Sequence, residues 1–134
     1  MSNPNKFDVF ISYSHKDSRW VRNVLLPKLE SHSFSVLIDF RDFKSGALSV
    51  DEMQRAVLES KRVILVLSEE YIQSEWAHFE NAMAQTLDPA AANRKMIPIL
   101  HKDCVIPLRI QIMTYRDLRV ETDETWQLLM QDLI

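Results

Sequence analysis

Residues 63–80 have the sequence VILVLSEEYIQSEWAHFE, and this stretch decides the fold. Its first five residues are branched and apolar, which predicts a strand that is buried on both faces of a sheet. From residue 72 onward the apolar side chains recur at helical spacing: Ile72, Trp76, Phe79, Met83 and Leu87. The stretch therefore predicts a strand that passes through a loop into a helix. Open α/β sheets bind ligands at such strand ends, so this junction is a candidate site.

Glu80 falls on the border of this apolar stripe, one helical turn after Trp76. An indole and a carboxylate are therefore expected side by side at the edge of the core. Each residue also has an ordinary structural interpretation, Glu80 as a solvated carboxylate beside the core and Trp76 as a core residue. The pair alone does not decide between these interpretations.

Further strand-like runs lie on both sides of this stretch. Strands are predicted at residues 7–13, 34–38, 62–67 and 96–100, with a short fifth strand at 113–115. Helical patterns alternate with them and begin near residues 18, 51, 72 and 123. Because parallel strands need crossover connections, this alternation predicts a doubly wound parallel α/β sheet with helices on both faces. Residues 1–134 are expected to form one domain, with a polar tail at 1–6.

Caps, prolines and the only glycine add local expectations. Asp17 or Ser18 is the predicted cap of the first helix, and Pro27 should bend that helix or remove one of its hydrogen bonds. Pro98 has no N–H group, so the strand at 96–100 is expected to be an edge strand or to carry a bulge. Residues 39–49 form a polar loop around Gly46, where positive φ or a close backbone approach is expected.

Composition narrows the class of protein. The net charge is −3 and acidic and basic residues are interspersed, which argues against a nucleic-acid or anionic-membrane surface. Cys104 is the only cysteine, so no internal disulfide can form and a reducing compartment is favoured. No signal peptide or membrane span is visible, so we expect a cytoplasmic protein. The four histidines lack metal-ligand spacing, with His101-x-x-Cys104 the only close pair, so no metal site is expected.

Several motifs occur in a characteristic order along the chain. They are FDVFISYS at 7–14, VLID at 36–39 with Gly46 seven residues on, VLS at 66–68 followed by Tyr71, Ser74 and Trp76-x-x-x-Glu80, and IPI at 97–99. Together they resemble a Toll/interleukin-receptor homology (TIR) domain over residues 7 to about 134, and the general pattern is similar to prokaryotic, NAD-cleaving members. The resemblance implies a flavodoxin-like, three-layer sheet, for which we predict the strand order 2-1-3-4-5.

In catalytic TIR domains the glutamate at this place in the helix is required to cleave the nicotinamide–ribose bond of NAD⁺, so the resemblance assigns that role to Glu80. Loss of a neutral pyridine from a cationic nucleotide needs no general acid, and one carboxylate can stabilise the oxocarbenium-like ribose that remains. NAD⁺ is then the substrate, and no cofactor is implied. Trp76 would wall the pocket, and Ser68 would lie at its rim.

The resemblance also implies that the loops after the first two strands line the nucleotide pocket. The residues concerned are Tyr13, Ser14 and His15 in the first loop and Asp39, Phe40, Lys44, Gly46 and Leu48 in the second. Some catalytic members carry arginines where this chain has Ser14 and His15, which leaves His15 and Lys16 as the candidates for a diphosphate contact. Lys44 and Arg41 can equally be solvated loop residues.

The second loop is also the family's self-association surface, through which a neighbouring copy can complete the site. The implied function is a self-associating NAD⁺ glycohydrolase or cyclase in immune or cell-death-type signalling. The alternative is a non-catalytic TIR adaptor that only makes homotypic contacts. The closing helix reaches Ile134 without a stop signal, so we expect further domains of a longer chain as partners.

Two other proteins with this topology can be weighed against the sequence. A response regulator needs an acidic pair after the first strand and an aspartate after the third, where this chain has Ser12, Tyr13 and Ser14, and then Ser68. A flavin-binding relative needs a glycine-containing phosphate loop after the first strand, and residues 14–18 contain no glycine. Both interpretations are rejected.

Overall fold

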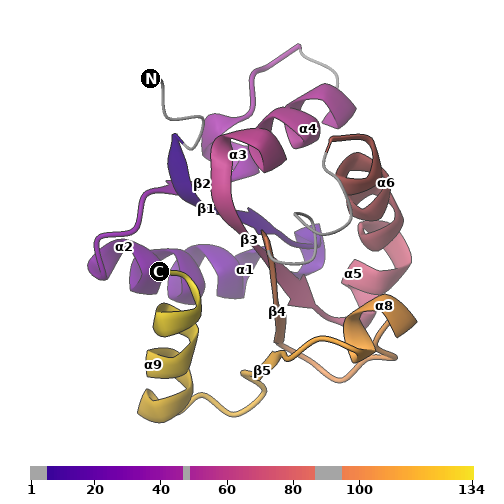
Figure 1. Ribbon diagram of the computed structural model, residues 1–134. Helices are drawn as coiled ribbons and strands as arrows, with labels where there is room; N and C mark the ends of the chain where they lie inside the picture. The colour runs from indigo at the N-terminus through magenta and orange to yellow at the C-terminus, as the bar shows by residue number, and fades with distance from the viewer. Residues whose placement is uncertain (1–5, 47–48, 87–94) are drawn as a thin grey trace.

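The computed structural model describes residues 6–46, 49–86 and 95–134. Its centre is a five-stranded parallel sheet in the order β2-β1-β3-β4-β5 (Figure 1). The strands are β1 (Phe7–Ser12), β2 (Val36–Leu37), β3 (Ser60–Leu67), β4 (Met96–Leu100) and β5 (Arg116–Asp117). The predicted flavodoxin-like order 2-1-3-4-5 is thus confirmed. Its switch point lies between β1 and β3, where ligands of such sheets bind.

Helical segments make the connections between the strands. The first connection contains a 3₁₀ segment (His15–Asp17), α1 (Ser18–Trp20), a π-helical segment (Val21–Leu25) and α2 (Leu26–Ser31). The later helices are α3 (Asp39–Asp42), α4 (Ser49–Glu59), α5 (Glu69–Ser74), α6 (Trp76–Thr86), α8 (Leu108–Gln111) and α9 (Asp123–Asp132).

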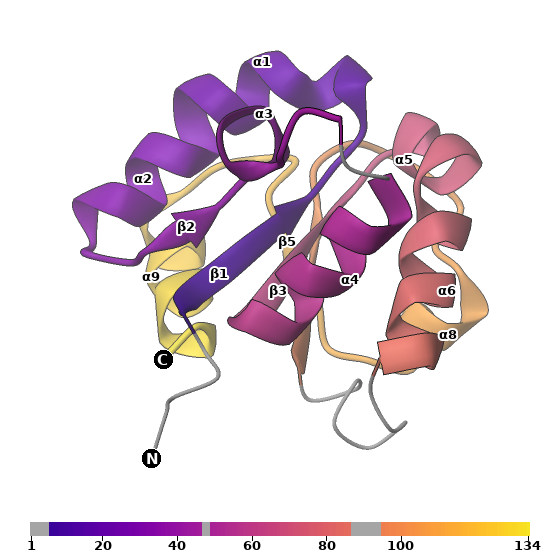
Figure 2. The same ribbon diagram turned by 90° about the horizontal axis from the view of Figure 1, so that it is seen from above.

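The sheet has a hydrophobic core on each face, because successive side chains of a strand point to opposite sides. On one face, Ile11 and Ile64 belong to the same cluster as the inward residues of the π segment, α2 and α9: Val21, Leu25, Leu29, Trp126 and Leu129. On the other face, Phe10 and Leu65 cluster with residues of α4, α5 and α6: Ala56, Val57, Tyr71, Phe79 and Met83. Figure 2 shows the two helical layers. Each fully buried large apolar side chain contributes roughly 1.5–3 kcal/mol, which holds the three layers together.

Pro27 has the predicted local effect. The Leu26 N–H donates to the Val21 carbonyl, five residues back, so the helix widens into a π turn just before the proline. Pro27 then lies in the first turn of α2, where its missing N–H is not needed. The predicted cap is correct in position only: Asp17 is the N-cap residue of α1, but its side chain makes no capping hydrogen bond there. Instead, the Ser14 hydroxyl accepts the Lys16 N–H at 3.2 Å and caps the 3₁₀ segment.

Three other elements differ from their predicted form. The fifth strand is Arg116–Asp117 and not 113–115, because the buried Leu118 anchors it by donating its N–H to the Leu100 carbonyl at 2.8 Å. The loop at 39–49 contains the short helix α3, and Gly46 has φ of +85° with open space around it, so positive φ explains this glycine. The helix predicted from Ile72 consists of α5 and α6, which are separated at Glu75. Leu87, the last residue of its predicted stripe, lies outside the described residues.

Candidate functional site

The carboxyl ends of β1, β2 and β3 meet at one edge of the sheet, because the strands are parallel. A cleft opens there beside α3, α4 and the junction between α5 and α6. Its outer part has a volume of about 370 Å³ and is lined by Asp39, Phe43, Val50, Met53, Glu75, His78 and Asn81. Its inner part, about 40 Å³, is lined by Phe10, Ile11, Ser12 and Tyr13 together with Asp39, Phe43, Met53 and Glu75. Because the two parts share four lining residues, we treat them as one cleft and call it the Asp39–Glu75 cleft.

Asp39 is held in position by two hydrogen bonds to the same oxygen. The Tyr13 hydroxyl donates to Asp39 Oδ1 at 2.6 Å, and the Phe40 N–H donates to it at 2.7 Å. Burial, and secondarily the hydrogen bond to Asp39, raises the pKa of Tyr13 to about 12. Tyr13 therefore remains a hydroxyl donor at neutral pH, and Asp39 Oδ2 is left as the oxygen that a ligand can use.

The inner wall combines aromatic and polar side chains. The rings of Phe10 and Phe43 stack with their centroids 6.0 Å apart, which gives the cleft a flat apolar side. The hydroxyls of Ser12 and Tyr71 are hydrogen-bonded at 2.9 Å where β1 ends. A cleft with carboxylates on its walls and an aromatic surface can accept a flat ligand that carries positive charge.

Glu75 and Glu80 lie on different sides of the helical layer. Glu75 lines both parts of the cleft, and His78 and Asn81, three and six residues later, line the outer part. Glu80 precedes Asn81 by one residue, which rotates it about 100° around α6. Its Oε2 lies 4.0 Å from Arg109 Nη1 of α8, its side chain is 44% exposed, and it does not line the cleft.

Two further residues expected in the pocket are part of the protein interior. Trp76 is buried in the core, with its ring 6.3 Å from that of Phe79, and does not line the cleft. Ser68 is fully buried, where its hydroxyl accepts the Tyr71 N–H at 3.1 Å and donates to Asp17 Oδ2 at 2.5 Å. Both positions are used for packing and capping.

The residues expected in the two loops are divided between the cleft and the surface. Tyr13 and Asp39 line the cleft. Ser14 is a buried cap, whereas His15 and Lys44 are exposed. Phe40 is half exposed, with the Arg22 guanidinium 4.0 Å from the centre of its ring. Gly46 supplies the turn described above, and Leu48 lies outside the described residues.

Sequence reasoning missed Phe43, Met53, Glu75, His78 and Asn81 as lining residues. A signal for three of them was present, since Glu75, His78 and Asn81 are polar residues at a spacing of three, on the side of the helix away from the apolar stripe.

A second polar group, the Asp17 cluster, fixes the loop after β1 to the ends of β3 and β4. It consists of Asp17, Ser68, His101 and Lys102, with Lys102 Nζ 3.4 Å and His101 Nε2 3.7 Å from Asp17 Oδ1. Asp17 is enclosed, and the imidazole of His101 stacks on Trp20 with centroids 4.1 Å apart. Burial lowers the pKa of His101. Among the described residues, no group of three or more His, Cys, Asp and Glu side chains is arranged to hold a metal ion.

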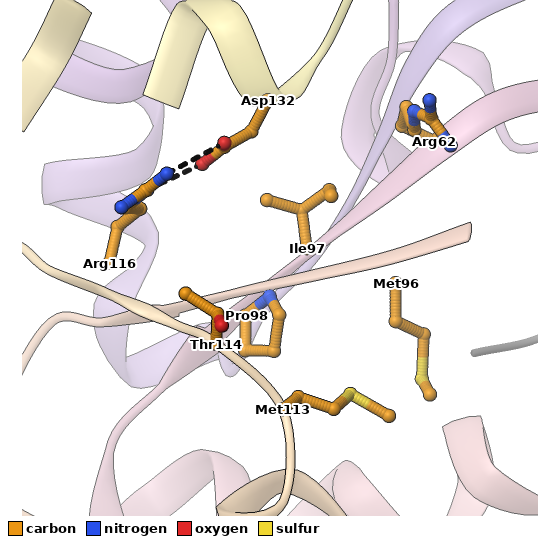
Figure 3. A pocket seen from close by; sticks show the side chains of 8 residues that line it. All are labelled: Arg62, Met96, Ile97, Pro98, Met113, Thr114, Arg116 and Asp132. Atoms are coloured by element: carbon orange, nitrogen blue, oxygen red, sulfur yellow. Dashed lines mark hydrogen bonds and ion pairs between the residues drawn. The ribbon is translucent and has the colours of Figure 1, made fainter. Parts of the chain in front are cut away.

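A separate groove of about 400 Å³ lies along the outer edge of β4 (Figure 3). β5 pairs only with Ile99 and Leu100, so at Pro98 the strand is an edge within the described part of the chain, as predicted. Arg116 and Asp132 close one side of the groove through two hydrogen bonds of 2.6 and 2.9 Å. The groove is lined by the first half of β4, at the other end from the Asp39–Glu75 cleft.

Comparisons with known proteins agree with this fold. A family model described as "TIR domain" matches residues 9–131. Protein toll of Drosophila melanogaster is 37% identical over 100 residues, 73% of this chain and 9% of that protein. Toll-like receptor 4 of Equus caballus is 37% identical over 125 residues, 90% of this chain and 15% of the receptor. The crystal structure of the TIR domain of the Toll-related receptor TRR-2 from Hydra magnipapillata superimposes with a TM-score of 0.81 at 26% identity, covering 96% of this chain and 98% of that one.

The chain thus spans less than a sixth of the length of these two curated relatives. All three proteins come from animals, so the prokaryotic, NAD-cleaving type stays a prediction. No helix within the described ranges has the length and apolar character to cross a bilayer.

Proposed function

The chain belongs to the TIR-domain family, and on this premise we propose that it is a signalling module of the prokaryotic, NAD-cleaving type, which breaks the nicotinamide–ribose bond of NAD⁺ when copies self-associate. The observation that carries the proposal is the Asp39–Glu75 cleft at the carboxyl ends of β1 and β2. Its outer volume of about 370 Å³ lies within the usual range for ligand pockets, roughly 300–1,000 Å³. Its carboxylates and stacked phenylalanines suit a flat pyridinium cation bound through a ribose.

The reaction requires the nicotinamide nitrogen to leave with the electron pair of its bond to ribose C1′. Nicotinamide departs as a neutral molecule, and the positive charge passes to the ribose ring. A carboxylate close to C1′ lowers the energy of that cation, and water then adds to C1′ and releases a proton. Attack by a nitrogen of the adenine ring in place of water would give a cyclic product instead. By the family resemblance the carboxylate is Glu80, with Trp76 packed behind it.

Self-association is the second part of the proposal. The outer cleft is near the small end of the range for ligand pockets, so a neighbouring copy could complete a site for the whole dinucleotide. Phe40 lies in the loop at 39–49 and Val50 directly follows it, and each is about half exposed, which suits a contact surface. NAD⁺ and a second copy are the proposed partners, the remainder of a longer chain is a third, and the cytoplasm is the proposed location.

A receptor-type adaptor that makes only homotypic contacts is the second candidate. The ion pair between Glu80 and Arg109 favours it, because Glu80 would have to leave this cation to reach the cleft. The similarity to Toll and Toll-like receptor 4 favours it as well.

Incubation of the purified domain with NAD⁺ at protein concentrations from nanomolar to high micromolar separates the two candidates, with products identified by mass spectrometry. Because a site completed by a neighbour forms only in the assembled state, turnover per molecule should rise with protein concentration. A turnover that stays flat would reject the shared site. If NAD⁺ is not cleaved at any protein concentration and not after enforced clustering, the adaptor remains as the candidate function.

A further inference from the structure

We propose that a groove between residues 16–24 and the residues after β4 binds a nucleoside diphosphate, which joins a flat ring to two phosphate groups. The groove has a volume of about 640 Å³, within the range of roughly 300–1,000 Å³ that is usual for ligand pockets. Its apolar wall and its cations come from Trp20, Val24 and His101 and from Lys16, Arg19 and Lys102. We call it the Trp20–Lys102 groove.

This groove is separate from the Asp39–Glu75 cleft. Trp20 and Val24 pack against the core on the α2–α9 face of the sheet. Phe43 and Met53 of the cleft pack against the core on the opposite face. None of the described residues lines both sites. A ligand in the groove would therefore leave the cleft open, and the inference stands apart from NAD⁺ cleavage.

The apolar wall of the groove is held in place by ring contacts. The imidazole of His101 stacks on Trp20 with centroids 4.1 Å apart, and the ring of Trp126 lies 6.4 Å from Trp20. The Trp20 indole N–H donates to Glu121 Oε2 at 3.2 Å. Burial lowers the pKa of His101, so its imidazole is uncharged at neutral pH and extends the wall. A flat ring can pack on such a surface at little cost in ordering side chains.

The charge of the groove is positive and partly unshared. Lys16 and Arg19 are exposed, and within the described residues their side chains have no hydrogen-bond or ion-pair partner. Lys102 shares its charge with Asp17, the one acid among the described residues that line the groove. Three cations thus face one carboxylate in a chain whose net charge is −3. Arginine and lysine are the side chains that bind phosphate oxygens best, the first as a fork and the second as a point charge.

The two kinds of lining together select the ligand. Inorganic phosphate or pyrophosphate would contact the cations and leave the apolar wall exposed to water. A nucleoside without phosphates would cover the wall and leave Lys16 and Arg19 unpaired. A nucleoside diphosphate satisfies both, because its ring and its phosphates are joined through a ribose.

Isothermal titration calorimetry of the chain with ADP, adenosine and pyrophosphate as probes tests the proposal. ADP should bind about 10-fold or more tightly than either of the other two probes, because it alone meets the wall and the cations. Lys16→Gln removes an exposed cation from the groove and should weaken ADP binding about 10-fold. Lys61→Gln is the matched control, an exposed lysine of β3 outside the groove, and should stay within about two-fold of the wild type.

Nuclear magnetic resonance of the indole N–H groups locates the bound ADP. The signal of Trp20, identified by its absence in Trp20→Phe, should shift when ADP is added. The signal of Trp76 should not shift, because Trp76 packs on the opposite face of the sheet. A shift of Trp76 with Trp20 unchanged would place ADP away from the groove and overturn the inference.

The binding data can also overturn it. A wild type that does not bind ADP removes the site. Equal losses in Lys16→Gln and Lys61→Gln would reduce the effect to net charge, and pyrophosphate that binds as tightly as ADP would show that the apolar wall takes no part. Because ADP binding is measured without turnover, a wild type that binds ADP in the groove and cleaves no NAD⁺ supports this inference while the proposed function fails.

Discussion

Two carboxylate sites lie along the same edge of the sheet and differ in the groups that surround the charge. In the Asp17 cluster, the carboxylate is enclosed and contacts Ser68, His101 and Lys102. In the Asp39–Glu75 cleft, the carboxylates line a cavity, and the Glu75 carboxylate has no hydrogen-bond or ion-pair partner within the described residues. The difference teaches that neighbouring strand ends can hold similar residues for different purposes. Enclosed charge joins loops to the sheet, whereas unpaired charge beside a cavity is available to a ligand.

Removing the enclosed carboxylate should have the larger effect on folding. Asp17→Ala deletes the acceptor of Ser68 and the counter-ion of Lys102, so we expect about 2–3 kcal/mol of lost stability. Turnover of NAD⁺ per folded molecule should not change, since Asp17 lies outside the cleft. Urea denaturation of Asp17→Ala, Ser68→Ala and the double variant measures both the loss and the coupling. A loss below about 1 kcal/mol, or a coupling near zero, would show that the cluster does not hold the loop.

Removing charge from the Asp39–Glu75 cleft should lower turnover and leave stability almost unchanged. Asp39→Asn keeps an oxygen that can accept from Tyr13 and Phe40, so stability should fall by about 1 kcal/mol or less. In the proposed NAD⁺ cleavage, turnover should fall about 10-fold, because Asp39→Asn removes a negative charge proposed to orient the cationic nucleotide. Steady-state kinetics at the activating protein concentration gives the comparison, with the exposed Asp123→Asn as control. Unchanged turnover in Asp39→Asn would mean that the cleft is not matched to a cation.

Much of the fold followed from sequence, because the strands that organise the sheet are continuous apolar runs. The run VILVL at 63–67 forms most of the central strand β3, and the landmarks at 7–14 and 97–99 fall on or beside its partners β1 and β4. The landmark at 36–39 falls on or beside β2, which pairs with β1. Short elements were less predictable. β5 is only two residues long and depends on the burial of Leu118, a tertiary contact that no local pattern records.

The candidate site was predictable to the level of the loops and not to that of each side chain. Tyr13 and Asp39 follow the ends of β1 and β2 and line the cleft as expected. Glu75 was missed because the predicted site was built on the motif residues Trp76 and Glu80, whereas Glu75 lies between α5 and α6 with φ of −111°.

The smallest expected effect is the pH dependence of stability that comes from the Tyr13–Asp39 hydrogen bond. It separates the contribution of the Tyr13 hydroxyl from that of the packing of its ring. The pKa of Tyr13 is raised from 10.0 to about 12 in the folded protein, so between these values the unfolded chain loses a proton that the folded chain keeps. This contribution to stability is complete below pH 10 and is lost as the pH rises towards 12.

Tyr13→Phe keeps the ring and removes the hydroxyl. The stability difference between wild type and variant should therefore start on the order of 1 kcal/mol at pH 8 and shrink between pH 10 and 12. Urea denaturation of both proteins at several pH values in this range measures it, with Tyr115→Phe as control because Tyr115 is more exposed. A difference that stays constant with pH would mean that the hydroxyl ionises as freely in the folded protein as in the unfolded chain, and Asp39 would then lack the donor that orients it in the cleft.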